Sequence, residues 1–184
     1  SLMDADPQLH ALMSEEVSRQ RQTLEMIASE NFAPVSVLQA QGSILTNKYS
    51  EGYPGRRYYG GCAHIDEIER LAIVRARKLF SADHANVQPH SGAQANAAAF
   101  GALMKPGDTV MGLALSHGGH LSHGTTMNAS GTFYKAVRYH LDADTGLVNL
   151  ETVASLARQH RPRVIVAGWT AYPRMVDWAG FRHI

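Results

Sequence analysis

A regular alternation of short apolar runs and helical patterns begins after residue 84, and it constrains the fold more than any other feature of the chain. The predicted strands are residues 85–87, 109–115, 133–139 and 164–167. The predicted helices are residues 92–104 and 150–160, with a further helix beginning near residue 176. This order predicts an α/β fold with a mainly parallel sheet flanked by helices. Because the alternation stops in mid-pattern, we expect the sheet to be incomplete in this chain.

The N-terminal part of the chain is organised differently. Asp6 and Pro7 predict the start of a helix, because a carboxylate cap precedes a proline at the first helical position. We expect this amphipathic helix to run to about Ile27, a short helix to follow over residues 35–45, and a longer one over residues 65–79. Residues 49–61 are rich in Gly, Tyr and Arg, and this composition predicts a functional loop rather than a regular element.

Composition narrows the classes of function. The 17 Lys and Arg residues nearly cancel the 16 Asp and Glu residues, so no net field draws the chain to nucleic acid or to an anionic membrane. No apolar run reaches the ~18–20 residues of a membrane span. The lone cysteine, Cys62, excludes an intrachain disulfide and is typical of a packed thiol in a reducing compartment. We therefore expect a cytoplasmic protein without nucleic-acid or membrane partners.

The first candidate site is the junction between the strand predicted at residues 85–87 and the helix that follows it. Small residues at a helix N-terminus leave backbone N–H groups free, and the helix dipole favours an anion there. Ser91 adds a hydroxyl donor, and Gly92 lets a phosphate approach the backbone. These features predict a phosphate site. The alternative is that Ser91 only caps the helix.

The second candidate is a row of three histidines at intervals of three, His117, His120 and His123. Their spacing suggests a metal site. On a helix, however, the three rings would spread over roughly 120°, and Gly118 and Gly119 disfavour a rigid helix. No carboxylate or Cys lies near enough in the sequence to complete a site. A ring stacked on another ring, or a histidine bonded in the core, is the favoured alternative, and we expect no metal.

The third candidate is Glu51 with its aromatic and basic neighbours. A carboxylate among tyrosines can serve in proton transfer when it is partly desolvated. On composition alone, a solvated loop Glu is the preferred interpretation. Arg56 and Arg57 either bind a carboxylate or phosphate group or lie in water.

Several long runs of residues occur together in one order. They are LEMIASEN at 24–31, LTNKYSEGYPGRRYYGGC at 45–62, NVQPHSG at 86–92, HGGHL at 117–121 and AYP at 171–173. By these motifs, which cover the chain from about Asp6 onward, the sequence resembles the serine hydroxymethyltransferase family. The resemblance implies a pyridoxal-phosphate enzyme of the aspartate-aminotransferase fold, also called fold type I. It divides the chain into a helical arm with an active-site and dimer loop, residues 1–60, and the first part of a cofactor-binding α/β domain, residues 61–184.

The activity that the resemblance implies is the reversible transfer of a hydroxymethyl group from serine to tetrahydrofolate. The products are glycine and 5,10-methylenetetrahydrofolate, pyridoxal 5'-phosphate is the cofactor, and the enzyme is a homodimer with shared active sites. The implied catalytic residues are Glu51, Tyr59 and His120. The implied cofactor-binding residues are Tyr49, Ser91, Gly92, Ala93, His120, whose ring stacks on the cofactor, and Thr170. The implied substrate-binding residues are Ser29, Glu51, Tyr58, Leu115, Gly119 and Leu121.

Two departures from the family pattern accompany the resemblance. Thr170 stands where the family usually has Ser, and its hydroxyl keeps a bond to the cofactor feasible. The family's cofactor-bound Lys, the Asp that pairs with the pyridine nitrogen and a carboxylate-binding Arg have no counterpart in the 184 residues, so we expect an N-terminal portion that is inactive alone. Two other hypotheses remain: a lyase of the same fold that cleaves β-hydroxy amino acids without folate, and a non-catalytic fragment that only dimerises or interacts.

Overall fold

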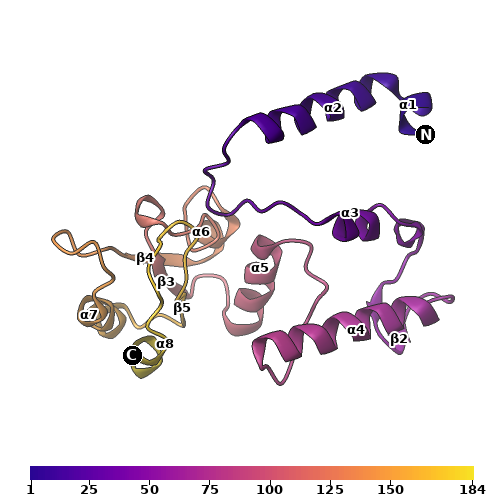
Figure 1. Ribbon diagram of the computed structural model, residues 1–184. Helices are drawn as coiled ribbons and strands as arrows, with labels where there is room; N and C mark the ends of the chain where they lie inside the picture. The colour runs from indigo at the N-terminus through magenta and orange to yellow at the C-terminus, as the bar shows by residue number, and fades with distance from the viewer. The chain divides into compact units, whose positions relative to one another are not determined.

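Three parallel strands form the sheet in the computed structural model, which describes residues 1–184 (Figure 1). The central strand is β3 (Thr109–Leu113), between β4 (Lys135–Tyr139) and β5 (Val164–Ile165). In the register of the sheet, Val110 of β3 lies opposite Ala136 of β4 and Val164 of β5. The predicted mainly parallel sheet is therefore present, with shorter strands than the apolar runs suggested.

Helices precede, connect and follow these strands as the alternation predicts. Helix α5 (Gly92–Leu103) precedes β3, and α7 (Leu150–His160) connects β4 to β5. A 3-10 turn, η2 (Leu115–His117), directly follows β3, and α8 (Trp178–His183) follows β5. Asn149 caps α7 by accepting from the backbone N–H groups of Glu151 and Thr152. The helix predicted at residues 150–160 is confirmed residue for residue.

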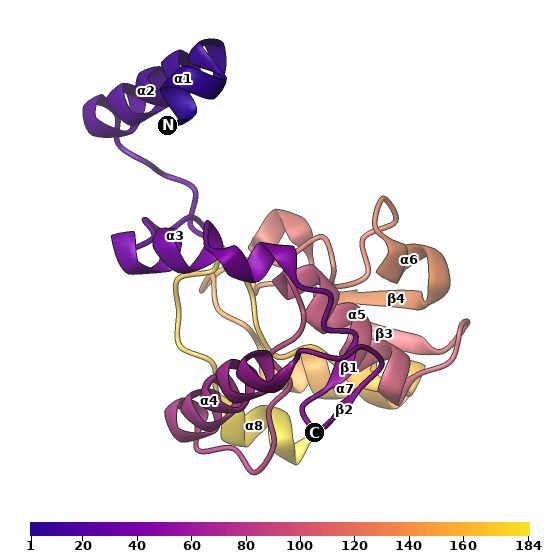
Figure 2. The same ribbon diagram turned by 90° about the vertical axis from the view of Figure 1, so that its right-hand side faces the viewer.

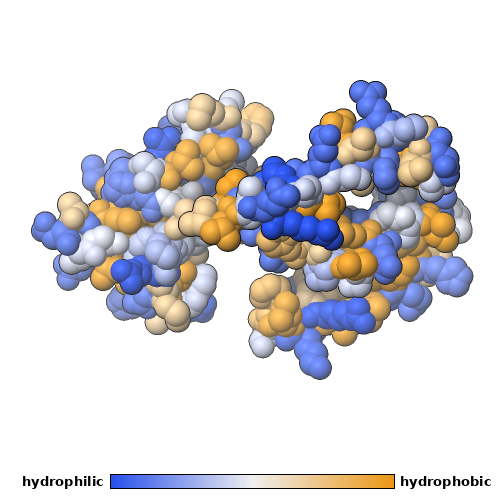
Figure 3. Space-filling view, turned by 45° about the horizontal axis from the view of Figure 1, so that its top comes forward, coloured by the Kyte–Doolittle hydropathy of each residue, from blue (hydrophilic) through white to orange (hydrophobic).

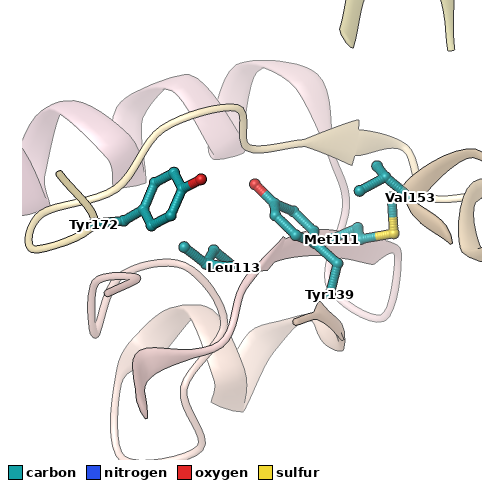
Figure 4. Packing of buried hydrophobic residues seen from close by; sticks show 5 residues of the cluster. All are labelled: Met111, Leu113, Tyr139, Val153 and Tyr172. Atoms are coloured by element: carbon teal, nitrogen blue, oxygen red, sulfur yellow. The ribbon is translucent and has the colours of Figure 1, made fainter. Parts of the chain in front are cut away.

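Strand β3 is buried on both faces, which is typical of a central parallel strand. Its alternating side chains enter two separate clusters. One cluster is Met111, Leu113, Tyr139, Val153 and Tyr172, shown in Figure 4. The other is Phe100, Met104 and Val110. The Tyr139 hydroxyl, buried in the first cluster, donates to the Val166 carbonyl oxygen at 2.8 Å, and burial raises the pKa of Tyr139.

The segment predicted as an irregular loop, residues 49–61, contains a small hairpin. Strands β1 (Gly52–Tyr53) and β2 (Arg56–Arg57) pair antiparallel. Gly52 and Gly55 have φ values of +100° and +78°, which only glycine adopts readily. The hairpin precedes α4, which runs over Ala63–Phe80. These bounds confirm the helix predicted at residues 65–79.

Several sequence-based predictions about elements are wrong. Residues 85–87 form no strand, because no segment pairs with them and the Asn86 side chain instead accepts from the backbone N–H of Gln88. The helix expected over residues 35–45 is split into α3 (Val35–Gln41) and a 3-10 turn, η1 (Ile44–Asn47), on either side of Gly42. Phe133 ends a helix, α6 (Ala129–Phe133), that the sequence analysis missed because five mostly small residues form no helical apolar pattern.

The chain divides into two units, Ser1–Phe32 and Ala33–Ile184. The first unit holds α1 (Leu2–Ala5) and α2 (Pro7–Gln22), which begins as predicted, with Asp6 accepting from the backbone N–H of Leu9. Helix α2 ends at Gln22 rather than near Ile27. The reason is that Thr23 is extended and its hydroxyl donates to the Arg19 carbonyl oxygen at 2.7 Å.

We expect the isolated 184-residue chain to self-associate, because it leaves much apolar surface uncovered. No residue of α1 or α2 is buried, and Met13 and Val17 of α2 are about half exposed. Figure 3 shows hydrophobic side chains spread over the visible face. Exposed apolar surface of this extent normally contacts other protein. Light scattering on the isolated chain tests this expectation, and a monodisperse monomer with one sharp thermal transition would contradict it.

None of the helices is both long enough and apolar enough to cross a lipid bilayer.

Candidate functional site

The N-terminus of helix α5 has the features of an anion site. Ser91 caps the helix by accepting from the Gln94 backbone N–H at 3.1 Å, and the Gln94 side chain accepts in turn from the backbone N–H of His90. The backbone N–H groups of Gly92 and Ala93 have no partner in the chain. A Cβ added at Gly92 would meet no atom within 4 Å. Free donors beside open space at a helix N-terminus suit a phosphate group.

His120 is connected to this helix by a chain of hydrogen bonds. Its Nδ1 lies 2.7 Å from the Ser122 Oγ, which accepts from the Nδ2 of Asn96 at 2.8 Å. Asn96 belongs to α5, and Figure 2 shows this helix beside the strands of the sheet. His120 is therefore tied to the helix that begins at the predicted phosphate-binding residues, and both belong to the unit Ala33–Ile184. Sequence analysis missed Asn96 and Ser122, because nothing in their local spacing links them.

The three histidines of the row do not converge. The Nδ1 of His117 accepts from the backbone N–H of Leu141, and its ring packs edge-on against His140 at 5.0 Å between centroids. His123 lies beside His120, with 5.6 Å between ring centroids. Burial, and then the closeness of His120, lowers the pKa of His123. No group of three potential metal-ligating side chains is brought together anywhere in the chain.

Thr170 is held next to the turn that carries His120. Two backbone N–H groups, those of Thr170 and Ala171, donate to the Gly118 carbonyl oxygen at 2.8 and 3.0 Å. Gly118 has a φ of +104°, and an added Cβ would lie 2.5 Å from the backbone nitrogen of Tyr172. Gly119 is buried, and a Cβ there would overlap the Leu113 carbonyl oxygen. The close approach of two backbone segments thus depends on this Gly-Gly pair.

The hairpin segment carries Glu51 and the predicted site tyrosines. Glu51 is exposed, its side chain makes no hydrogen bond within the chain, and its carbonyl oxygen accepts from the backbone N–H of Tyr58 at 3.2 Å. Tyr49 and Tyr59 pack edge-on with 5.9 Å between ring centroids. Tyr49 and Tyr58 are 77% and 78% exposed, so both rings are available to a ligand or another subunit. The carboxylate of Glu51 is thus solvated in this chain.

A buried ion pair attaches the hairpin to α4. Arg57, whose side chain is 5% exposed, donates to Asp66 at 2.8 Å and to Glu69 at 2.7 Å. Gln88 donates both to Glu69 and to the Gly52 carbonyl oxygen. Of the two alternatives for Arg57, the solvated side chain is wrong, and the carboxylates that the guanidinium binds are those of α4 itself rather than of a ligand. Arg56 is exposed.

Three of the remaining predicted site residues, Leu115, Leu121 and Ser29, lie at the surface. Leu115 and Leu121 are 44% and 42% exposed on either side of the Gly-Gly turn. Ser29 is exposed and belongs to the first unit, Ser1–Phe32. Cys62 is a buried free thiol whose Sγ contacts the Tyr59 carbonyl oxygen at 3.3 Å, so the predicted packed role is confirmed.

Acid should weaken the attachment of the hairpin. The Arg57 guanidinium, and then the backbone N–H of Gly55, holds the pKa of Asp66 below its ordinary value. A carboxyl whose pKa is lowered by folding contributes stability above its unfolded pKa of ~3.9, and that stability is lost as pH falls through the folded pKa. We expect Asp66→Asn to be less stable than wild type near neutral pH and to converge with it in acid. Urea unfolding of the whole protein at several pH values, with exposed Asp144→Asn as control, tests this; parallel curves would contradict it.

Comparison with known proteins identifies relatives over the whole chain. Residues 2–184 match the family model described as serine hydroxymethyltransferase. A serine hydroxymethyltransferase of Clavibacter sepedonicus is 60% identical over 183 residues, which are 100% of this chain and 43% of that protein. Those of Synechococcus sp. (strain JA-3-3Ab) and Mycobacterium tuberculosis (strain ATCC 25618 / H37Rv), the latter named serine hydroxymethyltransferase 2, are each 59% identical over the whole chain, which covers 42% and 43% of them. The chain thus spans less than half the length of these relatives.

Proposed function

Since the chain belongs to the serine hydroxymethyltransferase family, we propose that the whole protein transfers a hydroxymethyl group reversibly from serine to tetrahydrofolate with pyridoxal 5'-phosphate as cofactor. The observation that carries this proposal is the connection between the α5 N-terminus and His120. Free N–H groups of Gly92 and Ala93 suit an anionic group, and His120 offers a flat ring tied to the same helix. Pyridoxal phosphate has a phosphate that matches the free N–H groups and an aromatic ring that matches the His120 ring.

In this proposal the phosphate is held by Ser91, Gly92 and Ala93, and the ring lies against His120. The backbone N–H of Thr170 holds this residue beside the Gly118 turn. In this proposal its hydroxyl bonds the cofactor's ring oxygen. When bound, pyridoxal phosphate supplies an electron sink for the negative charge left on the amino acid as its hydroxymethyl group departs. The protein's task is to bind, to orient and to exclude water around that chemistry.

The substrates are handled by residues of the hairpin, the arm and the Gly-Gly turn. Ser29 binds the substrate carboxylate, and Tyr58 and Tyr59 line the site. Glu51 holds or moves a proton at the hydroxymethyl oxygen or at the folate. Leu115, Gly119 and Leu121 border the folate, and the exposure of the two leucines supports contact with a ligand.

The proposed assembly is a homodimer of fold type I subunits with shared active sites. Tyr49 reaches the cofactor phosphate of the neighbouring subunit, and its 77% exposure in the single chain supports that role. Residues 1–60 form the arm and the active-site loop, and residues 61–184 begin the cofactor-binding domain. The proposed location is the cytoplasm, and the product glycine links the activity to amino-acid biosynthesis and one-carbon metabolism.

The decisive experiment is serine turnover by the whole protein with and without tetrahydrofolate. We expect glycine and 5,10-methylenetetrahydrofolate to form in equal amounts, and serine cleavage to fall sharply without folate. Equal rates of serine cleavage with and without folate would favour a folate-independent lyase. Absence of turnover despite bound cofactor would favour a non-catalytic interaction protein.

We expect His120 to act through its ring and not as a metal ligand. His120→Ala should therefore weaken cofactor binding, because a flat surface against the cofactor ring is lost, whereas a chelator should leave activity unchanged. Titration of the whole apoprotein with pyridoxal phosphate measures the first effect, and an assay after dialysis against chelator measures the second. Activity lost to the chelator and restored by zinc would reinstate the metal interpretation of the histidine row.

A further inference from the structure

The orientation of the His120 ring is determined by its own turn. The backbone N–H of Ser122 donates to the His120 Nδ1 at 3.1 Å, and the Ser122 Oγ lies 2.7 Å from the same atom. A backbone N–H can only donate, so Nδ1 must accept. A neutral imidazole whose Nδ1 accepts carries its proton on Nε2. In an imidazolium, the Nδ1–H would point at the Ser122 N–H, which is unfavourable.

Asn96 strengthens this arrangement from helix α5. Its Nδ2 donates to the Ser122 Oγ at 2.8 Å, which occupies an acceptor position of the hydroxyl and leaves the hydroxyl proton to point at His120. Ser122 is only 3% exposed, so water has little access to these bonds. Hydrogen bonds in such a low-dielectric place are stronger than in water.

His123 is held beside His120 through the same ring nitrogen. Its Nδ1 accepts from the backbone N–H of His120 at 3.3 Å, which fixes the same tautomer as in His120. Burial lowers the pKa of His123, which favours its neutral ring. The two adjacent rings are both held through Nδ1, which in each ring accepts from a backbone N–H.

We infer that Asn96 and Ser122 are positioning residues, which hold His120 as the neutral Nε2–H tautomer at a set place relative to the N-terminus of α5. The inference rests on the proposed function, in which His120 lies against the cofactor ring. A neutral imidazole suits that role, because an uncharged ring can lie against the cofactor's pyridine ring without repelling a proton on its nitrogen. Asn96 lies in α5, the helix that begins at Gly92. The bonds from Asn96 through Ser122 to His120 therefore tie the ring of His120 to the helix whose N-terminus is the proposed phosphate site.

The tautomer is measured directly by long-range proton–nitrogen NMR on the whole apoprotein labelled with nitrogen-15 histidine. The His120 signals are assigned by their loss in His120→Gln. We expect the Nε2–H pattern in wild type. Asn96→Asp keeps the size of the side chain but replaces the donor by an acceptor, so it draws the Ser122 hydroxyl proton away from His120. This variant should shift the ring toward the Nδ1–H tautomer or the imidazolium.

Cofactor affinity supplies the second readout. Ser122→Ala removes the hydroxyl that bonds both Asn96 and His120. Because only one of these neutral bonds acts on the His120 ring, pyridoxal phosphate binding should weaken about three- to tenfold. Ser122→Thr keeps the hydroxyl and should restore the affinity. Ser155→Ala removes an exposed serine hydroxyl of α7 and serves as the matched control, for which we expect no change.

The outcomes separate this inference from the proposed function. An Nδ1–H tautomer in wild type, or a tautomer unchanged by both Asn96→Asp and Ser122→Ala, would overturn the inference. If the tautomer responds as expected but His120→Gln binds the cofactor as tightly as wild type, the positioning role stands and the stacking role of His120 in the proposed function is wrong.

Discussion

Glu51→Gln in the whole protein should lower folate-dependent serine turnover by ~10²–10⁴-fold, or about 3–5 kcal/mol of activation barrier. The substitution keeps the size and most hydrogen-bonding capacity of the side chain but removes its titratable proton. If the carboxyl handles a proton at the hydroxymethyl group or the folate, the loss falls on that step. Cofactor binding and the change in cofactor absorbance on adding serine should remain.

The measurement compares turnover with cofactor absorbance in the same variant. Glu67→Gln is the matched control, because Glu67 is exposed on α4 and pairs only with Arg70, an exposed ion pair of little energetic weight. Near-wild-type turnover of Glu51→Gln would return Glu51 to the interpretation of a solvated loop residue. Loss of the absorbance change would assign Glu51 to substrate binding rather than to proton transfer.

Gly118→Ala should destabilise the protein by about 2–6 kcal/mol and disturb both sides of the proposed cofactor site. Two costs add at this position. A non-glycine residue at a φ of +104° costs about 1–3 kcal/mol. The new Cβ would also lie 2.5 Å from the Tyr172 nitrogen, and relieving such overpacking costs about 1–3 kcal/mol more. The segment that carries Thr170 would have to move away from the turn that carries His120.

Gly107→Ala separates the two costs. Gly107 has a φ of +90°, but a Cβ there would meet no atom within 4 Å, so only the backbone cost applies. Chemical denaturation of the whole protein should therefore show a smaller loss for Gly107→Ala than for Gly118→Ala, and only the latter should weaken cofactor binding. Equal losses would show that close packing at Gly118 has no energetic weight.

Much of the local structure follows from the sequence itself. The cap of Asp6 and Pro7, the helix at residues 150–160 and the central strand from Thr109 are encoded by side chains within a few residues of one another, so local patterns suffice to predict them. The same holds for the start of α5, where Ser91 and Gly92 predict both a cap and a free helix end. The motifs that run from residue 24 to residue 173 also identified the family.

The tertiary structure decided the contacts between residues that are far apart in the chain. Residues 85–87 look like a strand but have no segment to pair with, and a strand without a ladder is not stable. The sequence shows that Arg57 can bind an anion but not which one. The fold decides this, because α4 places the carboxylates of Asp66 and Glu69 against its guanidinium. Asn96 meets Ser122 across 26 positions of sequence, and that contact leaves the Ser122 hydroxyl proton to point at His120. Local spacing determines which helices and strands can form, whereas the burial and pairing of polar groups depend on which segments the fold brings together.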